Sequence, residues 1–96
     1  NELYRLDTPL AASMSGTLFL LNEDSATEAV ISISDNDESR LGPEDEIMGL
    51  VLPKGETVYV ENIGLAPGER IFINSKSTKL YAVMNGVVVS GTYVNK

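Results

Sequence analysis

Eight short runs of strand-forming residues, separated by turn residues, constrain the fold of this 96-residue chain more than any other feature. The runs are rich in Val, Ile, Tyr, Phe and Thr. They are Leu3–Leu6, Thr17–Leu21, Ala29–Ser34, Ile47–Leu52, Thr57–Glu61, Arg70–Asn74, Leu80–Asn85 and Val87–Tyr93. Short strands repeating at about 8–13 residues are typical of antiparallel sandwiches and barrels. In the third run, Ile31 and Ile33 alternate with Ser32 and Ser34, which predicts a sheet with one wet face.

We therefore predict an all-β fold, an antiparallel β-sandwich of about seven or eight short strands. Jelly-roll and immunoglobulin-like layering both remain open. Residues 1–96 form a single domain, with 1–16 as an N-terminal segment and 88–96 as a C-terminal arm. The predicted inward-facing residues are Leu18, Leu20, Ile31, Ile33, Leu50, Val58, Val60, Ile71, Ile73 and Val83. For the run Leu18–Leu21, a slip of one residue would exchange the two faces.

Three sequence turns have recognisable types. Pro67-Gly68 fits a type II turn, because proline sets φ at the first central position and glycine accepts a positive φ at the second. Pro53-Lys54-Gly55 fits a type I turn followed by a left-handed glycine, and Asn85-Gly86 predicts a two-residue hairpin. The segment Gly42–Glu46 is a candidate for a single helical turn, since Pro43 suits a first helical position. We expect at most that one turn of helix.

The composition excludes most catalytic chemistry. The chain has no histidine and no cysteine, which removes the commonest general base, the Ser-His and Cys-His pairs and the thiolate metal sites. Its carboxylates lie in a solvated acidic stretch, which does not raise a pKa for acid catalysis. Gly64, Gly68 and Gly86 are isolated turn glycines and form no phosphate loop. We predict a protein that is not an enzyme, with no catalytic, cofactor-binding or metal-binding residues.

One stretch partly matches a calcium loop. Asp35, Asp37, Ser39 and Glu46 fall at positions 1, 3, 5 and 12 of a twelve-residue loop, where an EF-hand places oxygen ligands. Position 6, which requires glycine, holds Arg40, and no helices are predicted on either side. A polar loop between strands is therefore the favoured interpretation.

The charge of −7 is unevenly distributed. Residues 23–46 hold nine acidic residues and one base, whereas residues 47–96 carry a net charge of +2. Nucleic acid is not an expected partner, because phosphate binding requires a basic face. No apolar stretch reaches the length of about 18 residues that a membrane span needs. The acidic segment is either a solvated face or a surface that meets a basic patch on a neighbour.

The six aromatic residues allow two interpretations. They are Tyr4, Phe19, Tyr59, Phe72, Tyr81 and Tyr93. At strand positions such residues usually pack in the core or across strands. If instead several were exposed on one face, they would form a platform for stacking against sugars.

The stretch Ile63–Gly86 resembles the C-terminal half of small β-sandwich virion proteins of tailed phages. It has a leucine-turn-glycine element at Leu65–Gly68, an alternating strand, a Ser-rich loop and a last strand ending in glycine. Upstream, Leu18–Asn22 and Ala29–Ser34 are similar to two strands of that family, so the resemblance covers roughly residues 17–87. The chain differs at Asp7–Gly16, which replaces a Pro-Ala-Gly corner often found in the family.

The resemblance implies a non-enzymatic structural protein of the virion. The first expectation is a capsid decoration, or cement, protein on the phage particle surface, bound to the major capsid protein or another virion protein. The alternative is a tail, fibre or adhesin module that binds a host glycan or a neighbouring virion protein. No catalytic residues are carried over from the family.

Self-association is a further expectation, with a trimer favoured. A chain this small without disulfides has a thin core, which contacts with a neighbour would supplement. The apolar end Val87–Val94 would also expose a strand edge if it were uncovered. Another strand of the same sheet is one candidate to cover it, and a neighbouring subunit or the capsid, by strand addition, is the other.

Overall fold

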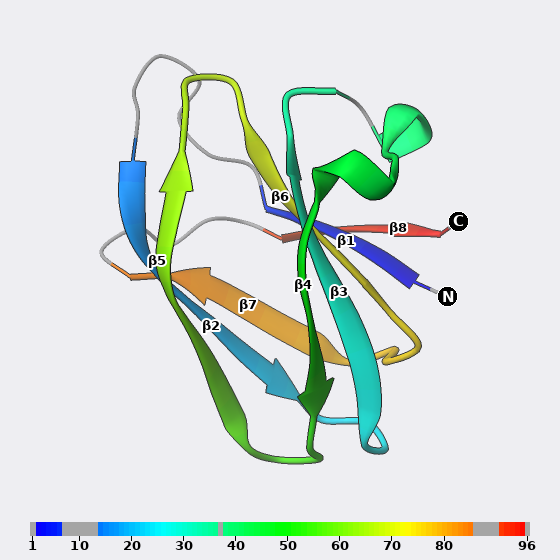
Figure 1. The fold of residues 1–96 in the computed structure, drawn as a ribbon. Helices are drawn as coiled ribbons and strands as arrows, with labels where there is room; N and C mark the ends of the chain where they lie inside the picture. The colour runs from blue at the N-terminus through cyan, green and yellow to red at the C-terminus, as the bar shows by residue number, and fades with distance from the viewer. Residues whose placement is uncertain (1, 7–13, 37, 86–90, 96) are drawn as a thin grey trace.

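The computed structural model describes residues 2–6, 14–36, 38–85 and 91–95 of the chain. In this part of the chain, eight strands form two sheets (Figure 1), which confirms the predicted all-β sandwich. The strands are β1 (Glu2–Leu6), β2 (Met14–Asn22), β3 (Thr27–Ser34), β4 (Glu46–Leu52), β5 (Thr57–Leu65), β6 (Arg70–Ser75), β7 (Leu80–Met84) and β8 (Gly91–Asn95). Each overlaps one of the eight predicted runs.

One sheet has five strands in the order β4-β3-β6-β1-β8, and the other has three in the order β5-β2-β7. All pairings within the two sheets are antiparallel, and β1 pairs with β8, β2 with β7 and β3 with β6. An immunoglobulin arrangement would make the first two strands neighbours. Here β1 and β2 lie in different sheets, so the immunoglobulin alternative is not observed.

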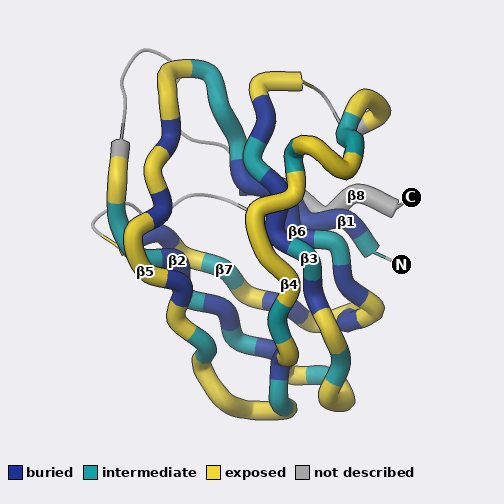
Figure 2. Tube along the Cα trace, viewed as in Figure 1, coloured by how far each residue is buried: buried dark blue, intermediate teal, exposed yellow. Residues whose placement is uncertain are grey.

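The main core lies between the two sheets. Leu18 and Leu20 of β2 face Ile31, Ile71 and Ile73 of the larger sheet, and all five are fully buried. Val60 is buried as predicted, while Ile33, Leu50 and Val58 are half-buried and pack against this core. Figure 2 shows the buried positions following the two facing sheets.

The prediction that Val83 faces inward is wrong. Val83 is 38% exposed, whereas the next residue, Met84, is completely buried. The register explains the difference, because Met84 lies opposite the buried Leu18 and Val83 lies opposite Phe19 on the outer face. Cross-strand partners in an antiparallel pair point to the same side of the sheet.

A second, smaller buried region lies on the outer face of the five-stranded sheet. Phe72 and Leu3 are 0% and 1% exposed, although they alternate with residues that face the main core. Residues 38–45, here called the covering loop, pass over this face, and Leu41 and Pro43 share a small cavity with Leu3 and Ser32. Ser32 and Ser34 are therefore buried, and the predicted wet face of this strand is wrong.

The covering loop contains two turns of 3-10 helix, η1 (Glu38–Arg40) and η2 (Pro43–Asp45). Pro43 begins η2, as the sequence predicted for a helical turn here. The Asp45 N–H donates to the Gly42 carbonyl at 3.0 Å, and the Asp45 carboxylate accepts from the Gly42 N–H at 2.9 Å. The turn η1 was not expected, so the limit of one helical turn is corrected to two within the described residues.

Two predicted glycine turns are confirmed by their backbone angles. Gly68 has φ of 85° and Gly55 has φ of 78°, both in the left-handed region. The Glu69 N–H donates to the Ala66 carbonyl at 3.1 Å, which closes the turn around Pro67-Gly68. Gly86 of the predicted Asn85-Gly86 hairpin lies outside the described residues.

Gly68→Val is expected to lower the free energy of unfolding by about 1–3 kcal/mol, because a β-branched side chain is strained at positive φ. Gly64→Val is the matched control, since Gly64 has an ordinary φ and open space where a Cβ would stand. Urea denaturation of both variants measures the difference. Equal unfolding midpoints for the Gly68 variant and the parent would contradict the turn.

The C-terminal strand is part of the same sheet. Gly91–Asn95 pairs along its length with Glu2–Leu6, so the chain's own sheet covers one edge of this strand, and β8 is itself the outermost strand of the sheet. Deleting residues 91–96 is therefore expected to lower the melting temperature, because it removes the pairing partner of β1. Circular dichroism melts of the truncated chain test this, and an unchanged melting temperature would contradict the pairing.

Candidate functional site

The outer side of the three-stranded sheet carries a cluster that we call the aromatic face: Phe19, Leu21, Tyr59, Tyr81 and Val83. Because Leu18 and Leu20 point into the core, Phe19 and Leu21 point outward. Phe19 lies opposite both Tyr59 of β5 and Val83 of β7, and Leu21 lies opposite Tyr81. Tyr59 and Tyr81 are 61% and 62% exposed. The two tyrosines thus flank the central strand on one open surface.

The Phe19 and Tyr59 rings are in direct contact. Their centroids are 5.1 Å apart and their planes are 82° from parallel, which is the edge-to-face arrangement favoured by aromatic quadrupoles. This contact fixes the ring of Tyr59 on the sheet surface, although most of it remains exposed. The aromatic face is therefore an ordered apolar surface rather than a set of independent side chains.

Two further aromatic residues, Phe72 and Tyr4, lie apart from the aromatic face. Phe72 is buried on the outer side of the five-stranded sheet, and Tyr4 is 9% exposed in the main core. The Tyr4 hydroxyl donates to the Ser77 carbonyl at 2.6 Å, and burial raises the pKa of the Tyr4 phenol. The side chain of Tyr93 lies outside the described part of the chain. The aromatic residues are thus divided between packing roles and one exposed cluster.

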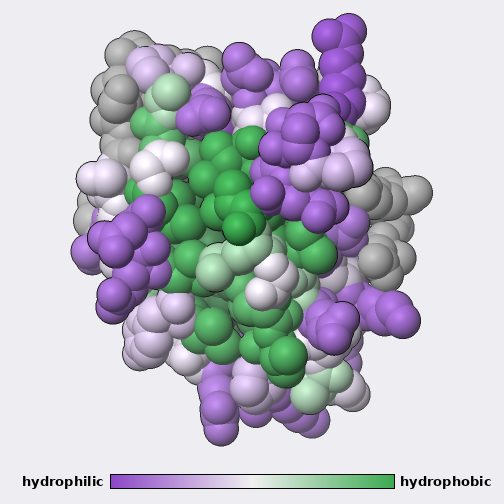
Figure 3. All heavy atoms as spheres, in the orientation of Figure 1, coloured by the Kyte–Doolittle hydropathy of each residue, from purple (hydrophilic) through white to green (hydrophobic). Residues whose placement is uncertain are grey.

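A second apolar surface, the β4 edge, consists of Ile47, Met48 and Val51. They are 48%, 41% and 62% exposed on the outermost strand of the five-stranded sheet. Figure 3 shows hydrophobic residues gathered over the middle of the molecule on the side where β4 and β5 lie in Figure 1. The sequence predicted this strand, but nothing in its pattern showed that it would lie at an edge.

A polar cluster closes one end of the sandwich, and its centre is the fully buried Asn22 at the end of β2. Asn22 Nδ2 donates to the carbonyls of Ser25 at 3.0 Å and Leu52 at 3.1 Å. Asn22 Oδ1 accepts from the Ser77 hydroxyl at 2.6 Å and from the Asp24 N–H at 3.0 Å. We call these contacts the Asn22 network. They join three connecting segments through satisfied hydrogen bonds, so the network is structural.

Asp24 extends the network toward solvent. Its carboxylate accepts from the N–H of Thr78 at 3.0 Å, the hydroxyl of Thr78 at 2.8 Å and the N–H of Ser25 at 2.8 Å. These hydrogen bonds, led by the one from the Thr78 backbone, lower the pKa of Asp24 to about 2. Asp24 is therefore ionised at neutral pH and ties the β2–β3 turn to the β6–β7 turn.

Lowering the pH is expected to weaken the contact between Asp24 and Thr78 over a defined pH range. Because the pKa of Asp24 is lower in the folded chain than in the unfolded chain, its contribution to stability is present above about pH 4 and is lost as the pH falls toward 2. Melting temperatures measured from pH 5 to pH 2 test this. Asp24→Asn should remove part of the pH dependence, and a variant whose pH profile matches the parent would contradict the assignment.

The calcium-loop candidate does not gather into a site in the described part of the chain. Asp35 is exposed after β3, Ser39 and Arg40 lie in η1, and Glu46 begins β4. Asp37 is outside the described residues. Among the residues that the structure describes, no group of three or more Asp or Glu side chains is placed to hold a metal ion.

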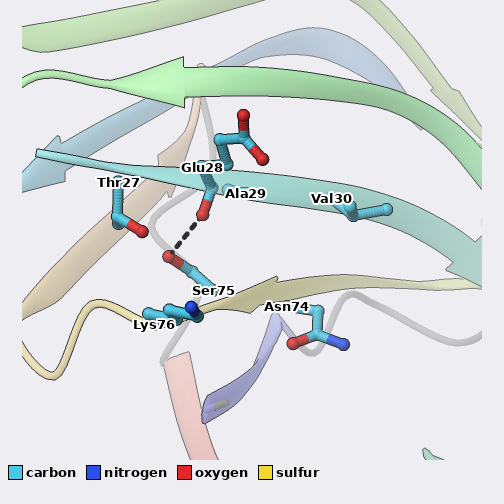
Figure 4. A pocket seen from close by; sticks show the side chains of 7 residues that line it. All are labelled: Thr27, Glu28, Ala29, Val30, Asn74, Ser75 and Lys76. Carbon is cyan, nitrogen blue, oxygen red and sulfur yellow. Dashed lines mark hydrogen bonds between the residues drawn. The ribbon is translucent and has the colours of Figure 1, made fainter.

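A shallow groove of about 350 Å³ lies between β3 and β6 (Figure 4). It is lined by Thr27, Glu28, Ala29, Val30, Asn74, Ser75 and Lys76. The Ser75 hydroxyl donates to the Glu28 carbonyl at 2.9 Å, while the Glu28 carboxylate points away from Ser75. Asn74 Oδ1 is buried with no hydrogen-bond partner among the described residues. One unpaired amide oxygen in an open groove does not make a binding site.

Comparisons with known proteins found no matching family model, no match among curated proteins and no match among solved structures. Within the described residues, no helix has the length and hydrophobicity required to cross a membrane. Any function must therefore be argued from the surfaces that this chain presents.

Proposed function

We propose that this chain is a non-enzymatic structural protein of a virion that attaches to the capsid surface as a decoration protein. The observation that carries the proposal is the aromatic face, an apolar surface on which Tyr59, Tyr81 and Val83 are exposed. Contiguous exposed apolar surfaces on proteins commonly mark interaction sites. Together with the resemblance of residues 17–87 to phage virion proteins, this surface favours attachment to another protein.

The described carboxylates support a non-enzymatic role. Acid catalysis by a carboxyl group needs a pKa raised toward neutrality by burial. Hydrogen bonds that serve the fold lower the pKa of Asp24, which is the opposite of the shift that acid catalysis needs. The grooves over β3 and β6 and beside β4 are open at the surface of the described part of the chain.

A second function, a tail, fibre or adhesin module that binds a glycan, is favoured by the same surface in a different way. Tyr59 and Tyr81 present exposed rings on one face, and a tyrosine combines an apolar ring with a hydroxyl that can hydrogen-bond. This arrangement suits sugars, whose rings have apolar faces and polar rims. Both functions use the aromatic face, but they require different partners.

The number of copies in each purified particle tests the first proposal and separates it from the second. Hundreds of copies, with co-sedimentation of the purified chain and undecorated capsids, would support decoration. A few to a few dozen copies would indicate a tail or fibre part. Absence from the particle would contradict both virion roles. Tyr59→Ala together with Tyr81→Ala is expected to abolish capsid binding while the chain keeps its fold, as a circular dichroism spectrum would show.

A further inference from the structure

The strand β4 is an unusually open edge. Among the described residues it pairs with β3 alone, and Ile47, Met48 and Val51 are all more than one third exposed. Natural edge strands are commonly protected by lysine, proline, a bulge or a covering loop. β4 contains no lysine or proline, and its bulge lies near its beginning, at Ile47. The rest of the strand is a regular apolar edge.

We propose that two copies of this chain pair through β4, antiparallel, about a two-fold axis at Gly49. The strand Glu46–Leu52 is apolar on both sides of this glycine. The pairing sets Met48 of each copy opposite Leu50 of the other, and Ile47 opposite Val51. It joins two five-stranded sheets into one continuous sheet and covers the exposed apolar side chains of both edges. This inference concerns self-association and does not depend on the proposed virion role.

Gly49 suits the position on the axis. On the axis, this residue of one copy lies directly opposite the same residue of the other copy. A residue without a Cβ minimises crowding between the two backbones there. A Cβ built on Gly49 would meet just the Ala29 carbonyl oxygen, at 3.8 Å, so packing within one copy does not require glycine there. A contact between two copies would explain why this position holds glycine, whereas the packing of the isolated chain does not explain it.

Charge complementarity selects the second copy as the occupant of this edge. In an antiparallel pair, the acidic beginning of β4 in one copy, which follows Glu44 of η2, lies beside the end of β4 in the other copy, which Lys54 follows. Both residues are exposed, and they lie just outside the two ends of β4. The two-fold axis repeats this opposite-charge contact, so each end of the paired strands has one. A register centred on Leu50 would instead set Pro53, which has no N–H, opposite Ile47.

The expected dimer is weak. Stable interfaces bury about 1,200–2,000 Å² in total, and one pair of short strands buries less than that. Dimerisation should therefore appear at concentrations of about 10–500 μM, the range of transient contacts. An isologous contact of this kind closes at two copies, which differs from the trimer expected from the sequence.

Sedimentation velocity of the full chain over this concentration range is the first test, and a concentration-dependent dimer is expected. Val51→Lys should raise the dimer dissociation constant by at least about tenfold, because a lysine on an edge strand opposes pairing. Tyr81→Lys is the matched control: Tyr81 is equally exposed, at 62%, on the edge strand β7 of the other sheet. A chain that stays monomeric throughout, or a dimer weakened equally by both variants, would overturn the proposal.

A charge exchange tests the antiparallel direction of the pairing. Glu44→Lys and Lys54→Glu should each weaken the dimer by about tenfold, because two symmetric contacts become repulsive together. The double variant should restore the parent dissociation constant. A double variant that binds no more tightly than either single variant would overturn the antiparallel pairing. Circular dichroism melts of each variant show that the fold is kept.

Discussion

Replacing Asn22 with alanine is expected to lower the free energy of unfolding by about 3–5 kcal/mol, a large effect for one polar side chain. Asn22 is completely buried, and its amide group uses both its donor and acceptor capacity within the network. Removing it leaves the Ser77 hydroxyl and the Leu52 carbonyl without those partners. A buried polar group that loses its partner costs more than the net value of the hydrogen bond.

Urea denaturation measures this loss, with Asn36→Ala as the matched control because Asn36 is exposed. The control should change the free energy of unfolding by less than about 0.5 kcal/mol. Asn22→Asp should also destabilise the chain at neutral pH, since a carboxylate cannot donate to the carbonyls of Ser25 and Leu52. If Asn22→Ala and Asn36→Ala had similar effects, the network would not hold this end of the sandwich together.

Phe72→Ala is expected to lower the free energy of unfolding by about 3–5 kcal/mol, which is as much as truncating a large side chain in the main core. Phe72 points to the outer side of its sheet, where an exposed aromatic ring would cost little to remove. The structure instead buries it completely, beside Leu3 and on the face that the covering loop crosses. The truncation should therefore leave a cavity that the loop fills incompletely.

Tyr59→Ala is the control for Phe72→Ala. Tyr59 is also an aromatic residue that points to the outer side of its sheet, but its side chain is 61% exposed. We expect its cost to stay below about 1.5 kcal/mol, most of it from the lost contact with Phe19. Thermal and urea unfolding of the two variants give the comparison. Equal losses would mean that Phe72 is not covered in solution and that its side of the sheet is wet.

The sequence on its own determined the local structure of this protein. Period-two alternation of β-branched and aromatic residues placed the eight strands, and it identified Ile31, Ile71 and Ile73 as inward-facing. Gly55 and Gly68 lie at positive φ because proline and glycine restrict the backbone over a few residues, wherever those residues are in the fold. The absence of histidine and cysteine likewise follows from composition alone.

The tertiary structure decided which faces and edges are covered. Alternation shows that Phe72 and Phe19 point away from the main core, but only the tertiary structure buries Phe72 completely and leaves Phe19 partly exposed. The register between β2 and β7 placed Met84 inside and Val83 outside. Strand order, which depends on contacts between distant segments, made β4 an edge and enclosed β1 between two neighbours. Burial is set by whichever part of the chain lies opposite a residue, and no local pattern contains that information.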